Sequence, residues 1–186
     1  MVQVSALTAS PANLAKADLL PLSDTSSGYL TKATIDQVVK PVCGMITATG
    51  TTTNLGAIGN TWTKVTAFDA VSGLGAGTTE SHSSDQITIT APYICLVMYS
   101  VSMNNATGAR QLGARLAKDG AAIAGSYGHE VTTAANSIGS IASQALVTLA
   151  ATDVITLEVA IPAGTSTGNV IINEANLTII PIGPAS

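Results

Sequence analysis

Charged side chains are scarce in this chain. Lysine, arginine, aspartate and glutamate make up 10% of its 186 residues, whereas globular domains usually carry roughly 25%. Hydrophobic residues account for 46%, and the mean hydropathy is +0.42. Other subunits that cover large apolar surfaces would compensate for so few solvated charges. The 7 basic residues face 11 acidic ones, and the net charge of -4 argues against binding to nucleic acid.

Aromatic side chains are also few, at 3% of the chain. Proteins that recognise sugars or receptors usually rely on exposed aromatic residues. The shortage therefore favours a role in assembly over a role in adhesion.

Motifs that carry catalysis or hold a cofactor are missing. The sequence contains no nucleophile elbow, no recognisable pair of catalytic carboxylates and no Walker-type loop. Its two histidines, His82 and His129, lie in polar stretches that we expect to be surface loops rather than metal or catalytic sites. Asp69, Glu80 and Asp85 are compatible with a Ca²⁺ site, although they lack the spacing of an EF-hand loop. We therefore expect a protein that is not an enzyme and has no cofactor.

Cysteines and long apolar runs are limited as well. Cys43 and Cys95 could form a disulfide bond, but Cys95 lies in an apolar stretch where a free thiol acts as a small hydrophobic residue. No apolar run reaches the roughly 18 residues of a membrane-spanning helix. The first residues, from Met1 to Val4, lack the features of a signal peptide. These patterns predict synthesis in the cytoplasm and no membrane insertion.

The stretch from Gln86 to Asn105 is the clearest structural signal. It predicts two strands that meet at Ala91-Pro92, because proline cannot donate a hydrogen bond within a sheet. The period of two in the second strand places two sets of residues on opposite faces: Tyr93, Cys95, Val97, Tyr99, Val101 and Met103 on one, and Ile94, Leu96, Met98, Ser100 and Ser102 on the other. The first half of this strand is apolar on both faces, so we expect a second sheet or another copy of the chain to cover the second face.

Further short strands are predicted along the chain, separated by turn residues and without a helical period between them. They cover residues 62–69, 86–90, 93–103, 110–118, 139–149, 154–161 and 170–180. This spacing is typical of an all-β antiparallel sandwich or jelly roll. We assign residues 61–186 to this domain and residues 42–60 to a linker and a first weak strand.

Residues 1–41 differ in kind from the rest. They predict a short helix over residues 12–16, an extended segment near Leu20, a turn, and a brief helix that begins at Thr34. The segment is too small to hold a core of its own. We therefore expect it to be an attachment arm that docks on another surface.

Several motifs, in this order, resemble the C1q/TNF-like trimeric jelly rolls, including versions encoded by phages. They are a strand with Trp62, the D-x-I-T-I strand from Asp85, the A-P-Y-I-C-L-V strand, the L-A-K-D-G turn, and V-T-L-A-A-T-D-V-I-T-L-E-V, which ends at Val159. The arm, with L-A-K-A-D-L-L-P-L and T-K-A-T-I-D-Q, resembles a segment at the front of phage virion proteins. The chain differs from the animal proteins of this type because it has no collagen stalk and no aromatic-rich core at the threefold axis.

The resemblance implies a homotrimer in which one sheet face turns toward a threefold axis, and a virion as the location of the protein. We expect a capsid decoration, or cement, protein of a bacteriophage, whose partners are the major capsid protein or other virion proteins. The alternative is the tip of a tail fibre or head fibre that binds a host receptor; an enzyme acting on polysaccharides is disfavoured. The residues expected in the trimer interface or core are Tyr93, Ile94, Leu96, Val97, Met98 and Tyr99, and those expected to attach to the capsid are Leu19, Leu20, Leu22, Tyr29, Leu30, Ile35 and Val38.

Overall fold

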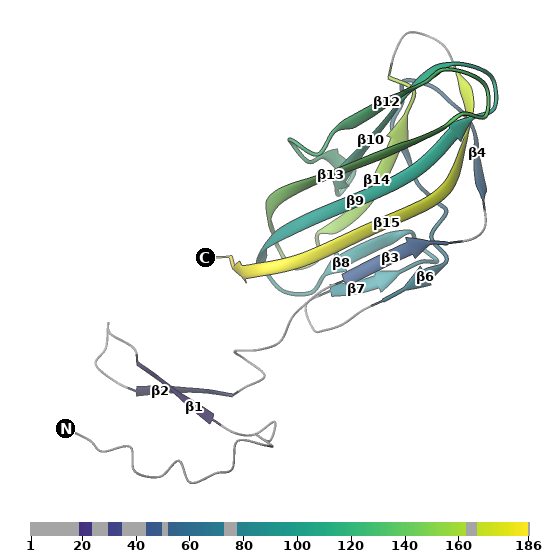
Figure 1. Ribbon diagram of the computed structural model, residues 1–186. Helices are drawn as coiled ribbons and strands as arrows, with labels where there is room; N and C mark the ends of the chain where they lie inside the picture. Colours follow the sequence, from purple (N-terminus) through teal and green to yellow (C-terminus); the bar gives the residue numbers. More distant parts are fainter. Residues whose placement is uncertain are drawn as a thin grey trace. The chain divides into compact units, whose positions relative to one another are not determined.

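A computed structural model describes residues 19–23, 30–34, 44–49, 52–72, 78–162 and 167–185 of the chain. The chain divides into two compact units, Met1–Lys40 and Pro41–Ser186 (Figure 1). Within the described ranges, no helix is long and apolar enough to cross a membrane.

The first unit contains an antiparallel hairpin of β1 (Leu19–Ser23) and β2 (Leu30–Thr34). Leu19 pairs with Thr34, and Leu22 pairs with Thr31. Thr34, where we expected a brief helix to begin, is the last residue of β2, and the remainder of that segment lies outside the described residues. The helix expected over residues 12–16 also lies outside them.

The second unit is a sandwich of two antiparallel sheets. The first sheet has the order β11-β10-β14-β8-β7, with β12 paired to β10 and β5 paired to β14. Its strands are β5 (Thr63–Lys64), β7 (Thr78–Ser81), β8 (Gln86–Ile89), β10 (Arg110–Lys118), β11 (Ala121–Ala122), β12 (Gly128–Thr132) and β14 (Val154–Ala160).

The second sheet has the order β13-β9-β15-β3-β6, with β4 paired to β15. Its strands are β3 (Gly44–Ala48), β4 (Thr53–Ile58), β6 (Ala70–Val71), β9 (Tyr93–Asn105), β13 (Ile138–Leu149) and β15 (Gly168–Pro184). In Figure 1, β13, β9 and β15 run side by side as one layer in front of β10 and β14. The segment 42–60, expected to hold a linker and one weak strand, contributes β3 and β4 to this sheet.

The core lies between the two sheets and consists of aliphatic side chains from alternate positions of their strands. Burial of each large aliphatic side chain contributes about 1.5 to 3 kcal/mol. The largest fully buried residues are Ile46, Ile87, Ile89, Met103, Leu112, Leu116, Leu149, Ile155, Leu157, Ile161, Ile172 and Leu177.

Two local predictions differ from the structure. The strand expected over residues 62–69 is regular only at Thr63–Lys64, because the segment then crosses between the sheets: the N–H of Val65 donates to Leu157 of β14, whereas that of Asp69 donates to Thr47 of β3. Between them, the N–H of Phe68 donates to the carboxylate of Asp85 at 3.1 Å. His129, which we placed in a loop, belongs to β12 and pairs with Gly113 of β10. The polar sequence around His129 is that of an edge strand with its side chains in solvent.

Candidate functional site

The long strand β9 separates its side chains into two sets, as the period of two predicts. Cys95, Val97 and Tyr99 point into the sandwich core, where they are 0%, 0% and 3% exposed. Tyr93 is partly buried and packs against the same core. The side chains of Ile94, Leu96 and Met98 lie on the outer face of the sheet and are partly exposed. The sequence alone left open which set fills the sandwich.

The outer face of β13, β9 and β15 carries an apolar row that crosses all three strands. Leu96 of β9 is directly opposite Leu146 of β13 on one side and Ile180 of β15 on the other. Leu146 is 65% exposed, although it is a large apolar residue. We call this outer face, together with that of β3, the assembly face.

The next rows along the strands become progressively more polar. Met98 lies between Gln144 and Thr178, and Thr178 is opposite Met45 of β3. One step further, Ser100 lies between Ala142 and Asn176. The assembly face is therefore apolar at the end nearest the C-terminus and polar around Ser100, and the exposed Ile138 of β13 lies beyond the polar rows.

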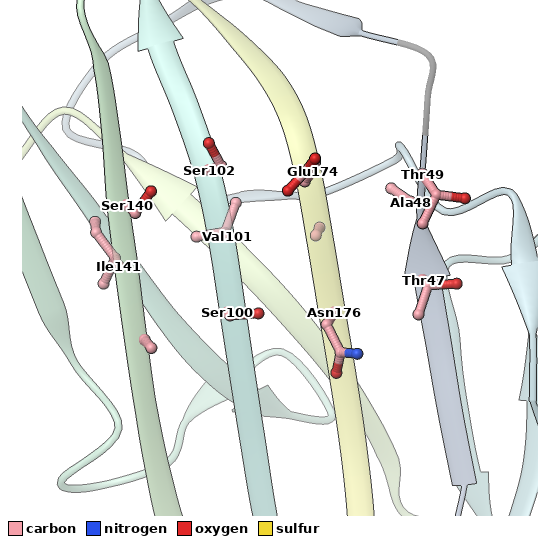
Figure 2. A pocket seen from close by; sticks show the side chains of 12 residues that line it. Thr47, Ala48, Thr49, Ser100, Val101, Ser102, Ser140, Ile141, Glu174 and Asn176 are labelled. Atoms are coloured by element: carbon pink, nitrogen blue, oxygen red, sulfur yellow. The ribbon is translucent and has the colours of Figure 1, made fainter.

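A hollow of about 410 Å³ occupies the polar part of the assembly face. Figure 2 shows Ser140, Ser102 and Glu174 on three neighbouring strands at its upper part, and these three residues are also in register with one another. Glu174 is the one charged residue among the 12 that line the hollow. Asn176 accepts a hydrogen bond from the hydroxyl of Thr178 at 2.6 Å, so part of the polar surface is already internally bonded.

The structure describes some of the residues that we expect to attach to the capsid, but not all of them. Leu19, Leu20 and Leu22 belong to β1, and Leu30 begins β2, so the hairpin brings these four positions together. Tyr29, Ile35 and Val38 lie outside the described residues.

The carboxylates that were compatible with a Ca²⁺ site have separate structural partners. Asp69 accepts hydrogen bonds from the backbone N–H of Thr49 at 3.1 and 3.2 Å, and Asp85 accepts one from Phe68. Burial raises the pKa of Asp85, against the opposing effect of that hydrogen bond. Among the residues that the structure describes, no three histidine, cysteine or acidic side chains gather as a metal site would require.

Leu146 and Ile180 are parts of the assembly face that sequence reasoning did not identify. The alternation of Ile138, Ser140, Ala142, Gln144 and Leu146 in β13 carried a local signal. The register that places Leu146 beside Leu96 comes from pairing between segments about fifty residues apart in the chain, which periodicity does not reveal.

Comparisons with solved structures agree with this arrangement of strands. The Eiger TNF from S. frugiperda aligns with a TM-score of 0.54 and 10% sequence identity, over 80% of this chain and 96% of that protein. The globular domain of the zebrafish complement 1qA protein aligns with a TM-score of 0.53 and 12% identity, over 77% of this chain and 99% of that domain. No protein-family model matches the sequence, and a search of curated proteins gives no match. The all-β prediction is therefore confirmed, and the second unit of this chain has the C1q/TNF-like jelly-roll fold.

Proposed function

We propose that this protein is a homotrimer whose subunits meet through the assembly face. The observation that carries the proposal is the row of Leu146, Leu96 and Ile180, because a solvated antiparallel sheet normally presents polar side chains on its outer face. Leu146 is 65% exposed, and Leu96 and Ile180 are partly exposed; an apolar row left open to solvent in this way marks a surface that another subunit covers. The threefold arrangement follows from the sequence resemblance to trimeric jelly rolls.

We propose further that the trimer decorates and stabilises a phage capsid. The resemblance of the N-terminal segment to the front of phage virion proteins supports this role, and the compact unit Met1–Lys40 supports a separate attachment arm. The chain contains no heptad repeat and no collagen repeat that would build a fibre shaft. We propose no catalytic activity.

Removal of residues 1–40 tests the role of the arm. The second unit has its own core, so we expect the shortened chain to keep its oligomeric state and to lose binding to capsids that lack the protein. Co-sedimentation with such capsids measures binding, with the full chain as the positive control. Capsid binding equal to that of the full chain would contradict the proposed attachment.

A fibre tip that binds a host receptor is the second candidate. Tyr127, which is 47% exposed and contacts Trp62, favours this role, because exposed aromatic residues often carry recognition. In this case the isolated protein would bind host cells and compete with infection, and it would not bind capsids through residues 1–40.

A further inference from the structure

Three ring side chains gather on the outer face of the first sheet, although they are distant in the sequence. Trp62 directly precedes β5, Tyr127 directly precedes β12, and His129 lies within β12. The rings of Trp62 and Tyr127 meet edge to face with centroids 5.7 Å apart, and those of Tyr127 and His129 are stacked with centroids 5.8 Å apart. We call these three residues the aromatic platform.

The platform lies over a small residue of the central strand β10. Gly113 is opposite His129 on one side and Ala160 on the other. A Cβ atom at Gly113 would lie 3.2 Å from both the Trp62 and the Tyr127 rings. The glycine therefore lets the two rings sit directly on the sheet, and their contacts hold them in place.

The charges near the platform are already compensated within the protein. The guanidinium group of Arg115 lies 4.4 Å from the centre of the Trp62 ring. The same group forms an ion pair with Glu158, at 2.7 Å from Nη2 and 2.8 Å from Nε to one carboxylate oxygen. A ligand that approaches Trp62 thus meets an internally neutral pair of polar groups rather than a free cation.

The outer parts of the platform are open to solvent. Tyr127 is 47% exposed, Val131 further along β12 is 59% exposed, and His129 is exposed. The side chains of Arg115 and Glu158 are only 20% and 11% exposed, so Tyr127 and His129 are the more exposed polar side chains of the surface. The surface therefore combines apolar rings with a few hydrogen-bonding groups, in a chain that has six aromatic residues in total.

We propose that the aromatic platform binds a neutral saccharide. The C–H face of a sugar ring is apolar and packs on aromatic rings, while its hydroxyl groups bond to polar atoms at the edge of such a site. The paired charges of Arg115 and Glu158 favour a neutral ligand over an anionic one. The net charge of -4 argues against stacking of nucleic-acid bases on the same rings.

The saccharide site is independent of the proposed trimer and of the capsid role. The platform lies on the outer face of the first sheet, whereas the assembly face is the outer face of the second sheet, on the opposite side of the sandwich. We therefore expect a trimer that packs through the assembly face to leave the platform accessible, and loss of saccharide binding to leave the oligomeric state unchanged.

The experiment uses the full chain on a printed array of neutral and acidic glycans, followed by titration in solution with each glycan that binds. Trp62 is the one tryptophan of the sequence, so its fluorescence reports directly on the site. We expect a saturable change in fluorescence with at least one neutral oligosaccharide. Binding should be about tenfold weaker in Tyr127→Ala, which removes the ring, and nearly unchanged in Tyr127→Phe, which keeps it.

Leu146→Ser is the control on the opposite sheet and should bind saccharide as the unaltered chain does. Far-ultraviolet circular dichroism of each variant confirms that it is folded. The absence of any neutral ligand on the array would overturn the proposal. So would binding to acidic glycans alone, or equal affinity in Tyr127→Ala and in the unaltered chain.

Discussion

The hydroxyl group of Tyr99 joins the two sheets of the sandwich. It lies 2.8 Å from the carbonyl oxygen of Ala114 in β10 and 3.0 Å from that of Ser126, and its single hydrogen is shared between these two buried acceptors. Tyr99→Phe keeps the ring and removes the donor, so we expect the free energy of unfolding to fall by about 1 kcal/mol. Urea unfolding measures the change. Tyr127→Phe, at an exposed tyrosine, is the control and should cause little change; equal effects of the two substitutions would contradict the assigned role.

Two buried groups in β9 make the stability of the protein sensitive to alkaline pH. Burial raises the pKa of the Cys95 thiol to about 11 and, as the largest of several effects, raises the pKa of Tyr99 to about 12. The ordinary values are 9.0 and 10.0, so the unfolded chain loses these protons first. The contribution of these two groups to the free energy of unfolding is therefore complete at a pH below their ordinary pKa values. It is lost as the pH rises through their pKa values in the folded protein.

We therefore expect the urea midpoint to decrease from about pH 8 to about pH 11. The midpoint of Cys95→Ala should fall less between these two pH values than the midpoint of the unaltered chain does, because the variant has only one of the two groups. A midpoint that stays constant or rises over this range would show that these groups do not control the alkaline limit.

At the level of strands, β10 forms two ion pairs, one with β14 and one with the turn that precedes β14. The two pairs differ in how far their side chains are exposed to solvent. Arg115 contacts Glu158, whose side chain is 11% exposed, whereas Lys118 is 39% exposed and bonds to Asp153 at 3.1 Å. Burial opposes ionisation of Asp153, but the backbone N–H of Ala150 and the Lys118 ammonium outweigh it and lower the pKa of this carboxyl group. Asp153 thus keeps a hydrogen bond when its lysine is removed.

We expect Arg115→Met to lower the free energy of unfolding by about 2 kcal/mol, because it leaves Glu158 buried without its main partner. Lys118→Met should cost less than about 1 kcal/mol, because its pair is more exposed and screened by solvent. Chemical unfolding of both variants at low and high salt makes the comparison. A larger loss in Lys118→Met would show that burial does not set the strength of these pairs.

For the whole molecule, adjacent residues of β9 distinguish assembly from folding. Leu96 lies on the assembly face, and Val97 is 0% exposed in the core. Leu96→Asp places a charge where another subunit would pack, so we expect a folded monomer of 18.6 kDa in place of a trimer of about 56 kDa. Val97→Asp should prevent folding altogether, because the charge enters the core of each subunit.

Light scattering gives the native mass of each variant, and circular dichroism reports whether its sheet structure persists. A trimeric Leu96→Asp protein would contradict the proposed interface. A monomeric unaltered chain would remove the physical basis of the trimer itself.

The extended backbone of the long strands could be predicted from the sequence, since alternation of side chains is a local property. The bounds expected for residues 110–118 coincide with β10, and those for residues 139–149 differ from β13 by one residue. The same period divided β9 into the set with Val97 and the set with Leu96. Only the packing of the two sheets decided which set is buried, because both sets are apolar in the first half of the strand.

The assembly face and the aromatic platform depend on pairing between distant strands. Leu146 lies beside Leu96 because β13 pairs with β9, and Trp62 meets Tyr127 because β5 and β12 flank β14 and β10 in one sheet. No local pattern encodes such neighbours, since the register of long-range pairs sets them. The amino-acid sequence by itself thus determined the strands and their two-faced character, and the tertiary structure decided which side chains share a surface.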